Sequence, residues 1–211
     1  KEANPEALIL AEHYGDPASW LEGDQWDSIM NYDAFMEPVT WFLTGMEKHS
    51  DSYNGGIWGD GEAFFNAMGY HMSRMQTNTV MTAMNQLSNH DHSRFLTRTN
   101  QMVGRIQTAG PEKAGQNIKP CVFREAVVIQ MTWPGAPTLY YGDEAGVCGW
   151  TDPDSRRTYP WGSEDLELIE FHRYMTGIHK RVPAFRKGSV KPLAAGYQKI
   201  AYGRMYEDYQ A

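Results

Sequence analysis

The amino-acid sequence predicts an α/β fold in which parallel strands alternate with helices, followed by a short β region. Four short apolar runs, each ending in polar side chains, are separated by loops and helix-like segments. This alternation is typical of parallel strands joined by helical crossovers. After the last helical segment, short β-like runs are punctuated by Gly196 and Gly203. Four strand–loop–helix units amount to half of an eight-stranded barrel.

The strands are predicted in chain order from their composition and from the residues that end them. Residues 7–11 are wholly apolar, which is the pattern of a strand covered on both faces. Residues 26–32 form the second strand, and the third strand ends at Leu87. Residues 138–141 form the fourth, after a Pro-Gly-Ala-Pro sequence starting at Pro134 has ended the preceding helix. The polar residues that follow these strands are expected to share one edge of the sheet.

Helices are predicted between and after these strands. A short helix covers residues 38–46, a long one starts at Glu62, a third covers residues 121–131, and a fourth ends near Arg181. Residues 97–119 are predicted to be a loop with some helical content. The long helix and the fourth helix carry apolar residues at helical spacing. These are Phe64, Phe65, Met68, Met72, Met75, Leu166, Ile169, Phe171, Met175 and Ile178.

Composition narrows the class of function. The 211 residues are 41% hydrophobic and 13% aromatic, with seven Trp and twelve Tyr. Such a surplus of rings indicates either a binding cleft or packing. A net charge of −7 without a Lys/Arg-rich run argues against nucleic acid, and no apolar run approaches the roughly 20 residues of a membrane span. Cys121, inside the buried third helix, and Cys148 are expected to be reduced and structural, which fits a bacterial cytoplasmic location.

The ends of the predicted sheet raise the question of what completes it. The chain starts at Lys1 without an initiator Met or an apolar signal region, so we expect it to come from within a longer polypeptide. Half a barrel has two unpaired strand edges. Either the chain is a fragment, or another molecule, including a second copy of the chain, covers those edges.

The densest group of polar side chains follows the third strand, where Asn89, His90, Asp91 and Arg94 crowd one turn. Glu12 follows the first strand, so both carboxylates are expected to point into the same mouth. One neutral and one ionised carboxylate are the working parts of glycoside hydrolysis. His90 and Arg94 are candidates to hold sugar hydroxyls or to keep Asp91 charged. Flat faces for sugar rings are expected from Trp20, Trp26, Tyr14 and Tyr32.

Less specific interpretations remain open at each position. A lone carboxylate after a strand, such as Glu12, is more often a helix cap or a solvated loop residue than a catalytic group, and Asp91 is as typical of a structural ion pair as of catalysis. His90, Asp91 and His92 resemble metal ligands, but neighbouring residues on an extended strand point to opposite faces, so no metal is predicted. No cofactor is predicted either. Charged residues after the fourth strand either line the cleft or form a solvated loop: Asp143, Glu144, Asp152, Asp154, Arg156 and Arg157.

At these residues the chain resembles the alpha-amylase family of glycoside hydrolases. Leu-Ala-Glu ending at Glu12, with Tyr14 beyond, resembles the motif after the fifth barrel strand, whose Glu is the general acid/base. Residues 88–91, with Arg94 beyond, resemble the motif after the seventh strand, whose Asp stabilises the transition state and whose His binds the sugar. Residues 134–144 resemble the run into the eighth strand.

The resemblance implies a fold and a set of roles. Residues 1–187 would be the C-terminal half of a (β/α)8 TIM barrel, strands five to eight, and residues 188–211 the start of a C-terminal β-sandwich. Residues 20–32 are similar to the neopullulanase and cyclomaltodextrinase branch, which implies α-glucan oligosaccharides such as maltooligosaccharides, cyclodextrins or pullulan-type glucans as substrate. The implied catalytic residues are Glu12 and Asp91. The implied substrate-binding residues are His90, Tyr14, Arg94, Asn89, Trp20 and Tyr32.

Two departures from the family pattern matter. An apolar residue and often a Trp follow the acid/base Glu in the family, where this chain has His13 and Tyr14. The family's nucleophilic Asp belongs to an Arg-x-Asp motif after the fourth strand, and no such motif occurs in these 211 residues. A retaining mechanism needs that carboxylate, so the chain alone is expected to be inactive. Two other functions remain open: a glucosyltransferase or isomerase of the same family, and a non-catalytic carbohydrate-binding or assembly module.

Overall fold

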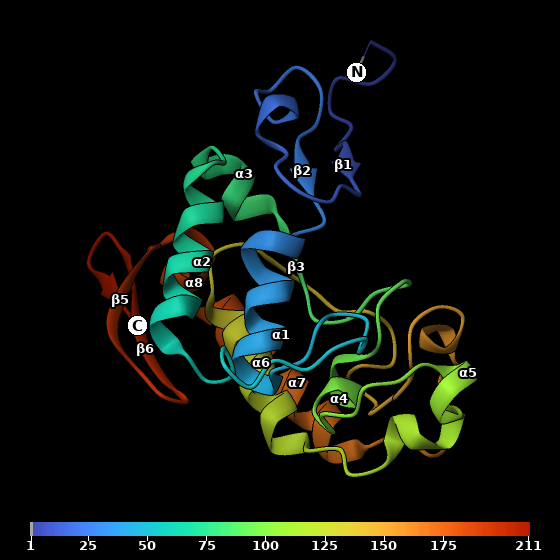
Figure 1. Cartoon of the computed structure of the whole chain (residues 1–211). Coiled ribbons are helices and arrows are strands. Elements are labelled where there is room, and N and C mark those ends of the chain that lie inside the picture. The colour runs from blue at the N-terminus through green and yellow to red at the C-terminus, as the bar shows by residue number, and fades with distance from the viewer. Residues whose placement is uncertain (1) are drawn as a thin grey trace.

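Two pairs of short parallel strands link the helices of the computed structural model, which describes residues 2–211. The strands are β1 (Leu10–Ala11), β2 (Ser28–Ile29), β3 (Met84–Gln86) and β4 (Ala136–Thr138). β1 pairs in parallel with β2 and β3 with β4, and a parallel bridge between Met30 and Met84 joins the two pairs. The predicted alternation of parallel strands with helices is therefore confirmed. Figure 1 shows β1 and β2 at one end of the molecule, with the helices below them.

Helices follow each strand, close to the predicted positions. The longer ones are α1 (Glu37–Thr44), α2 (Gly61–Ser73), α3 (Thr77–Thr82), α6 (Pro120–Thr132) and α7 (Leu166–Arg181). Shorter helical segments are η1 (Ala18–Trp20), η2 (Tyr32–Met36), α4 (Phe95–Arg98), α5 (Ile106–Ala109), η3 (Pro111–Gly115), η4 (Asp154–Arg156) and α8 (Pro183–Lys187). No helix within residues 2–211 is both long and apolar enough to cross a bilayer.

The core lies where the helical faces meet the sheet. Phe64 and Met68 on α2 are fully buried at helical spacing and pack with Phe123 of α6 and Leu168 of α7. Asp60 caps the start of the helix α2, and its side chain accepts a hydrogen bond from the Ala63 N–H at 2.9 Å, the usual way to satisfy a first-turn donor. Burial of one face of each helix thus holds the strands in place, and with them the loops that follow.

Two strand predictions were wrong in detail. Residues 7–11 were expected to be covered on both faces, but Leu8 is 67% exposed and Leu10 is 37% exposed. An apolar composition indicates that a strand is suited to burial, but burial requires neighbouring elements on both sides. In residues 2–211, β1 pairs with β2 alone. The fourth strand lies earlier than predicted and contains Pro137, opposite Asn85. Proline is tolerated there because, among the described strands, β4 pairs only with β3, so its other side needs no amide donor.

The cysteine prediction was partly wrong. Cys121 is exposed at the start of α6, not buried within it. The apolar face of α6 turns the neighbouring Phe123 into the core and leaves Cys121 outside. Cys148 is half-buried, and burial raises the pKa of its thiol to about 11, so it stays protonated at neutral pH.

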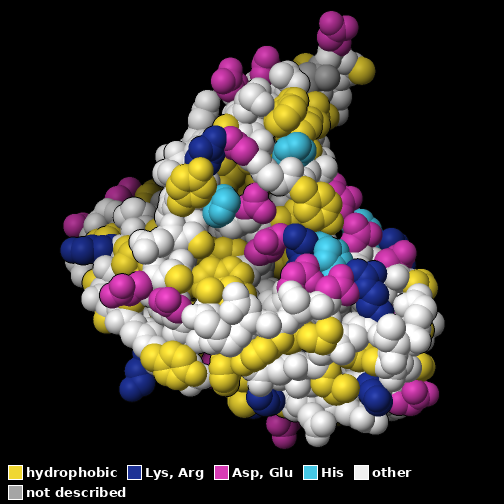
Figure 2. Space-filling view, in the orientation of Figure 1, with side chains coloured by type: hydrophobic (Ala, Val, Ile, Leu, Met, Phe, Trp, Pro, Cys, Tyr) yellow, Lys and Arg dark blue, Asp and Glu magenta, His cyan; other side chains and the backbone are white. Residues whose placement is uncertain are grey.

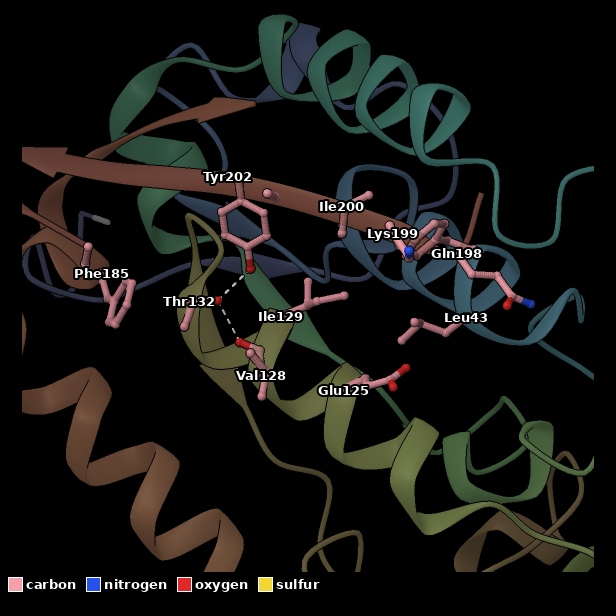
Figure 3. A pocket seen from close by; sticks show the side chains of 13 residues that line it. Leu43, Glu125, Val128, Ile129, Thr132, Phe185, Gln198, Lys199, Ile200 and Tyr202 are labelled. Atoms are coloured by element: carbon pink, nitrogen blue, oxygen red, sulfur yellow. Dashed lines mark hydrogen bonds between the residues drawn. The ribbon is translucent and has the colours of Figure 1, made fainter. Parts of the chain in front are cut away.

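The C-terminal residues form a separate antiparallel sheet that is fixed to α6. Its strands are β5 (Ser189–Gly196), β6 (Lys199–Tyr206) and β7 (Tyr209–Gln210). Figure 3 shows Tyr202 of β6 reaching Thr132 of α6, with 2.6 Å between their hydroxyl oxygens. A cavity of about 580 Å³ lies beside this contact, between α6 and β6. Arg204, fully buried, donates to the carbonyl oxygens of Thr132 and Gly188.

Arg204→Leu is expected to lower the free energy of unfolding by about 3 kcal/mol. The substitution leaves buried carbonyl groups of α6 and β5 without their charged donor, and each lost partner costs about 1–3 kcal/mol. Urea unfolding of both proteins measures the difference. Lys191→Leu, on the exposed surface of β5, is the matched control and should change stability by less than about 0.5 kcal/mol. Equal effects of the two substitutions would contradict the role given to Arg204.

Candidate active site

Glu12, His90 and Asp91 come together at the ends of two strands. Glu12 follows β1 directly, and His90 and Asp91 belong to the turn after β3. The Glu12 Oε1 atom lies 3.2 Å from His90 Nε2, which lies 3.6 Å from Asp91 Oδ1. One ligand atom from each of the three side chains lies within 4.8 Å of the others. The two carboxylates therefore lie side by side with the His90 ring in contact with both, and all three side chains are partly exposed.

Tyr32 and Asn89 form hydrogen bonds that hold Glu12 and the turn at Asp91. The Tyr32 hydroxyl donates to Glu12 Oε1 at 2.8 Å and accepts from Asn89 Nδ2 at 2.9 Å. Asn89 Oδ1 accepts from the backbone N–H groups of Asp91 at 3.0 Å and of His92 at 2.9 Å. Burial, and then the bond to Glu12, raise the pKa of Tyr32, which therefore remains a donor. Tyr32 and Asn89 are 1% and 2% exposed, so they present almost no surface to a sugar and instead bond to neighbouring residues of the site.

Tyr14 packs against Tyr32 and Lys48, and it remains 47% exposed. One face stacks on Tyr32, with ring centroids 4.6 Å apart and planes within 5°. The Lys48 ammonium lies over the Tyr14 ring, 5.4 Å from its centroid. Tyr32 therefore covers one face of the Tyr14 ring, and the contact between Tyr14 and a pyranose stays a prediction. Its hydroxyl lies 3.2 Å from His92 Nε2 and 3.5 Å from Asp91 Oδ2.

Trp20 belongs to a second aromatic group near the N-terminal end. Its ring stacks on Trp26 at 5.1 Å, and the His13 ring lies 4.8 Å from Trp20 and 5.3 Å from Trp26. Figure 2 shows apolar side chains toward this end of the molecule and acidic, basic and histidine side chains gathered across the middle of the same face. Trp20 is partly exposed and remains a candidate to contact a sugar.

Arg94 does not reach the space between the carboxylates. Its side chain is fully buried, pairs with Asp143 Oδ1 at 3.0 Å, and donates to the carbonyl oxygens of Ser155 at 2.8 Å and Tyr141 at 2.7 Å. The Tyr140 ring covers the guanidinium, with the centroid 4.1 Å from Cζ. The expected contact with sugar hydroxyls is therefore wrong for Arg94. Its side chain instead holds the loop after β4 against the loop after β3.

The residues after β4 are not a solvated loop throughout. Asp143 and Asp154 are 4% and 7% exposed. Burial raises the pKa of Asp143, and the positive charge of neighbouring Arg94 offsets only part of that rise. Asp154 accepts from the Trp150 N–H at 2.8 Å and pairs with Arg157. Sequence reasoning missed the burial of Asp143 because its partner, Arg94, lies 49 residues earlier in the chain.

His92, Lys48 and His49 are the site neighbours that were not assigned roles from the sequence. His92 is fully buried; its Nδ1 lies 3.1 Å from Met36 Sδ, and the His49 ring meets its edge at 4.7 Å. Burial, and then the positive charge of Arg98, lower the pKa of His92 to about 2. The sequence did contain an indication for Lys48 and His49, because both lie in the loop of the second strand–loop–helix unit. That loop is at the edge of the sheet where the other polar residues meet.

Stability is expected to fall between pH 6.5 and pH 5 because of His92. Its folded pKa of about 2 lies below the usual 6.5, so in this window the unfolded chain binds a proton that the folded chain does not. Stability is then lost as the pH falls, by about 1.5 kcal/mol over this interval. Urea unfolding at the two pH values should show that loss in the wild type and a smaller one in His92→Gln. Equal losses would mean that His92 is protonated in the folded protein.

The sequence argument against a metal at His90 and Asp91 assumed an extended strand, and that local structure is wrong. His90 and Asp91 lie in a turn after β3, so both approach Glu12 and do not point to opposite sides of a strand. The distances among the three groups are those of hydrogen bonds and ion pairs within the protein. A second group, Glu47, His49 and Asp51, is likewise satisfied by protein partners: Asp51 pairs with Arg105, and Glu47 accepts two backbone N–H bonds and contacts the His49 ring. We assign no ion to either group.

Comparison with known proteins gives a consistent family. Residues 1–191 match the sequence model described as "Alpha amylase, catalytic domain". The chain is 35% identical over 204 residues to neopullulanase 2 of Thermoactinomyces vulgaris, covering 96% of this chain and 30% of that protein. It is 32% identical over 209 residues to a cyclomaltodextrinase of Thermoanaerobacter pseudethanolicus, covering 98% of this chain and 31% of that protein.

A solved structure shows the same arrangement. The debranching enzyme of Nostoc punctiforme superposes with a TM-score of 0.79 at 28% identity, covering 99% of this chain and 40% of that one. The chain thus spans about a third of the length of the curated relatives and less than half of this structure. The chain belongs to the alpha-amylase family and represents part of its α/β-barrel catalytic domain.

Proposed function

We propose that this chain is the second half of the catalytic barrel of a retaining glycoside hydrolase that cleaves α-glucosidic bonds. The substrates proposed are maltooligosaccharides, cyclodextrins and pullulan-type α-glucans. The names of the relatives, neopullulanase and cyclomaltodextrinase, support this substrate class. In this proposal residues 1–187 supply strands five to eight, and residues 188–211 begin a C-terminal β domain.

The observation that supports the proposal is the approach of the Glu12 and Asp91 carboxylates to within 4.8 Å of each other at the ends of β1 and β3. In the first step, Glu12 gives its proton to the glycosidic oxygen as the bond to the sugar breaks. Asp91 remains ionised and stabilises the positive charge that develops on the sugar ring. His90, between the two carboxylates, is placed to donate a hydrogen bond to a sugar hydroxyl. In the second step, Glu12 takes a proton from the attacking water.

The positioning groups explain why Glu12 can serve both steps. One oxygen of its carboxyl group is held by the Tyr32 hydroxyl, which is itself held by Asn89. A carboxyl group that is oriented by a buried chain of hydrogen bonds needs little reorganisation energy when the proton moves. The covalent intermediate requires a nucleophilic carboxylate, and we propose that residues outside these 211 supply it.

Two linked assays test this function. The 211-residue chain alone is expected to release no glucose or maltose from maltotriose, cyclodextrin or pullulan above the buffer rate, since the intermediate cannot form. The full-length protein that contains these residues is expected to hydrolyse at least one of them and to release the α-anomer first, as seen by NMR. Turnover by the chain alone, abolished by Glu12→Gln, would contradict the proposed division of the catalytic carboxylates.

The same assays separate the alternative functions. Transfer of glucosyl units to a second sugar in place of water would indicate the transferase of the same family. Binding of maltotriose to full-length protein that neither Glu12→Gln nor Asp91→Asn weakens, together with no turnover, would indicate a non-catalytic carbohydrate-binding module.

A further inference from the structure

The Tyr14 hydroxyl has one proton and two neighbouring acceptors. His92 Nε2 lies 3.2 Å from the hydroxyl oxygen and Asp91 Oδ2 lies 3.5 Å from it. The longer distance is outside the usual range for a hydroxyl–carboxylate hydrogen bond, about 2.5–3.0 Å. Burial, and the negative charges of Asp91 and Glu12, raise the pKa of Tyr14, so the hydroxyl keeps its proton at neutral pH. Which acceptor takes that proton affects the charge that Asp91 presents to a substrate.

The surroundings of His92 determine which ring nitrogen carries its hydrogen. His92 Nδ1 lies 3.1 Å from the Met36 sulfur, which can only accept. A lone pair on Nδ1 would face sulfur lone pairs, so the hydrogen belongs on Nδ1. The Nε2 lone pair then points to the Tyr14 hydroxyl. A second proton is disfavoured because the ring is buried and lies close to the charges of Arg98 and Lys48.

We propose that His92 is a positioning residue that draws the Tyr14 hydroxyl proton away from Asp91 and so preserves the full negative charge of the Asp91 carboxylate. The ring of Tyr14 stacks on Tyr32 and lies near the Lys48 ammonium, and its hydroxyl lies within reach of both acceptors. The role of His92 in the reaction rests on the proposed function of Asp91, whereas the hydrogen-bond arrangement does not.

The energetic consequence follows from the strength of charge-assisted bonds. A hydroxyl bonded to an ionised carboxylate forms a short bond, about 2.5–2.7 Å, that stabilises the resting carboxylate. Part of that stabilisation must be lost when Asp91 turns its charge toward an oxocarbenium-like sugar, so the barrier rises. Without an acceptor at position 92, the Tyr14 oxygen needs to move by only about 1 Å to make this bond. His92 therefore keeps the Tyr14 hydroxyl from bonding to Asp91, the proposed transition-state stabiliser.

The first test uses the wild-type chain and does not depend on catalysis. Nitrogen-15 NMR of the 211-residue chain, labelled in histidine, is expected to show His92 as the neutral tautomer with hydrogen on Nδ1 at pH 7. Tyr14→Phe should shift the Nε2 resonance of His92 and leave the tautomer unchanged. A His92 ring with hydrogen on Nε2, or with two hydrogens at pH 7, would overturn the proposal.

The second test uses the full-length protein and a double substitution. His92→Leu is expected to lower kcat on maltotriose about tenfold with little change in KM, because Tyr14 then bonds to Asp91. Tyr14→Phe added to His92→Leu should recover most of the lost kcat, although it removes a second polar group. His92→Gln, which keeps an acceptor, should fall between wild type and His92→Leu.

A merely structural role of His92 predicts the opposite pattern. The double variant would then be as slow as His92→Leu or slower, and that result would overturn the proposal. If His92→Leu does not fold, the tautomer and the His92→Gln rate decide: an Nδ1–H tautomer with partial activity supports the proposal, and any other tautomer rejects it. A full-length protein without any hydrolysis would refute the proposed function while leaving the NMR result intact.

Discussion

Glu12→Gln in the full-length protein is expected to lower kcat for maltotriose by about 1000-fold. Glutamine keeps the size of the side chain and can still accept from Tyr32, but its amide has no acidic proton to transfer to the leaving oxygen. General acid catalysis by a positioned carboxyl typically contributes about 10²–10⁴-fold. Glu22→Gln, an exposed residue in the loop between β1 and β2, is the matched control and should keep the wild-type rate.

The loss should depend on the leaving group. In α-maltosyl fluoride the leaving group is fluoride, which departs without a proton. On that substrate the Glu12→Gln variant should therefore cleave the bond at most of the wild-type initial rate, measured as the burst of fluoride. A general loss of activity, equal for both substrates, would mean that Glu12 supports the fold or binding and is not the acid. A rate on maltotriose within about tenfold of the wild type would exclude Glu12 from proton transfer.

Arg94→Met is expected to lower the free energy of unfolding by about 3–5 kcal/mol, a large effect for a single substitution. It leaves Asp143 buried without its cation and frees the carbonyl oxygens of Tyr141 and Ser155. Urea unfolding measures the difference. Arg173→Met, on an exposed pair in α7, is the control and should cost less than about 1 kcal/mol.

The double variant Arg94→Met/Asp143→Leu distinguishes an ion pair from simple packing. Removing both partners eliminates the uncompensated charge, so the double variant should be more stable than Arg94→Met. Additive losses would mean that Arg94 acts through its other contacts and that the pair with Asp143 contributes little.

The sequence was a good guide where the periodicity of apolar residues alone decides the structure. α7 was expected to end near Arg181 and does, and α2 begins one residue before the predicted Glu62. Phe64 and Met68 are buried as their spacing predicts. The fourth strand was misplaced because a proline was taken as a helix breaker only, although the edge of a sheet accepts it.

The site could be predicted only in part. Local order along the chain places Glu12 and Asp91 at strand ends, which is enough to predict that they meet. It does not predict that Arg94 turns inward to Asp143, or that Tyr14 stacks on Tyr32 near Lys48, because these contacts join residues distant in sequence. Sequence identifies residue types that suit a cleft; tertiary packing decides which of them face it.

The most direct measurement is a crystal structure of the full-length Glu12→Gln protein with maltotriose. A glycosidic oxygen is expected within about 2.6–3.2 Å of the residue at position 12, with the Asp91 carboxylate facing the anomeric carbon of the adjoining ring. Maltotriose bound away from Asp91, for example in the cavity between α6 and β6, would contradict the placement of the reaction between these two carboxylates.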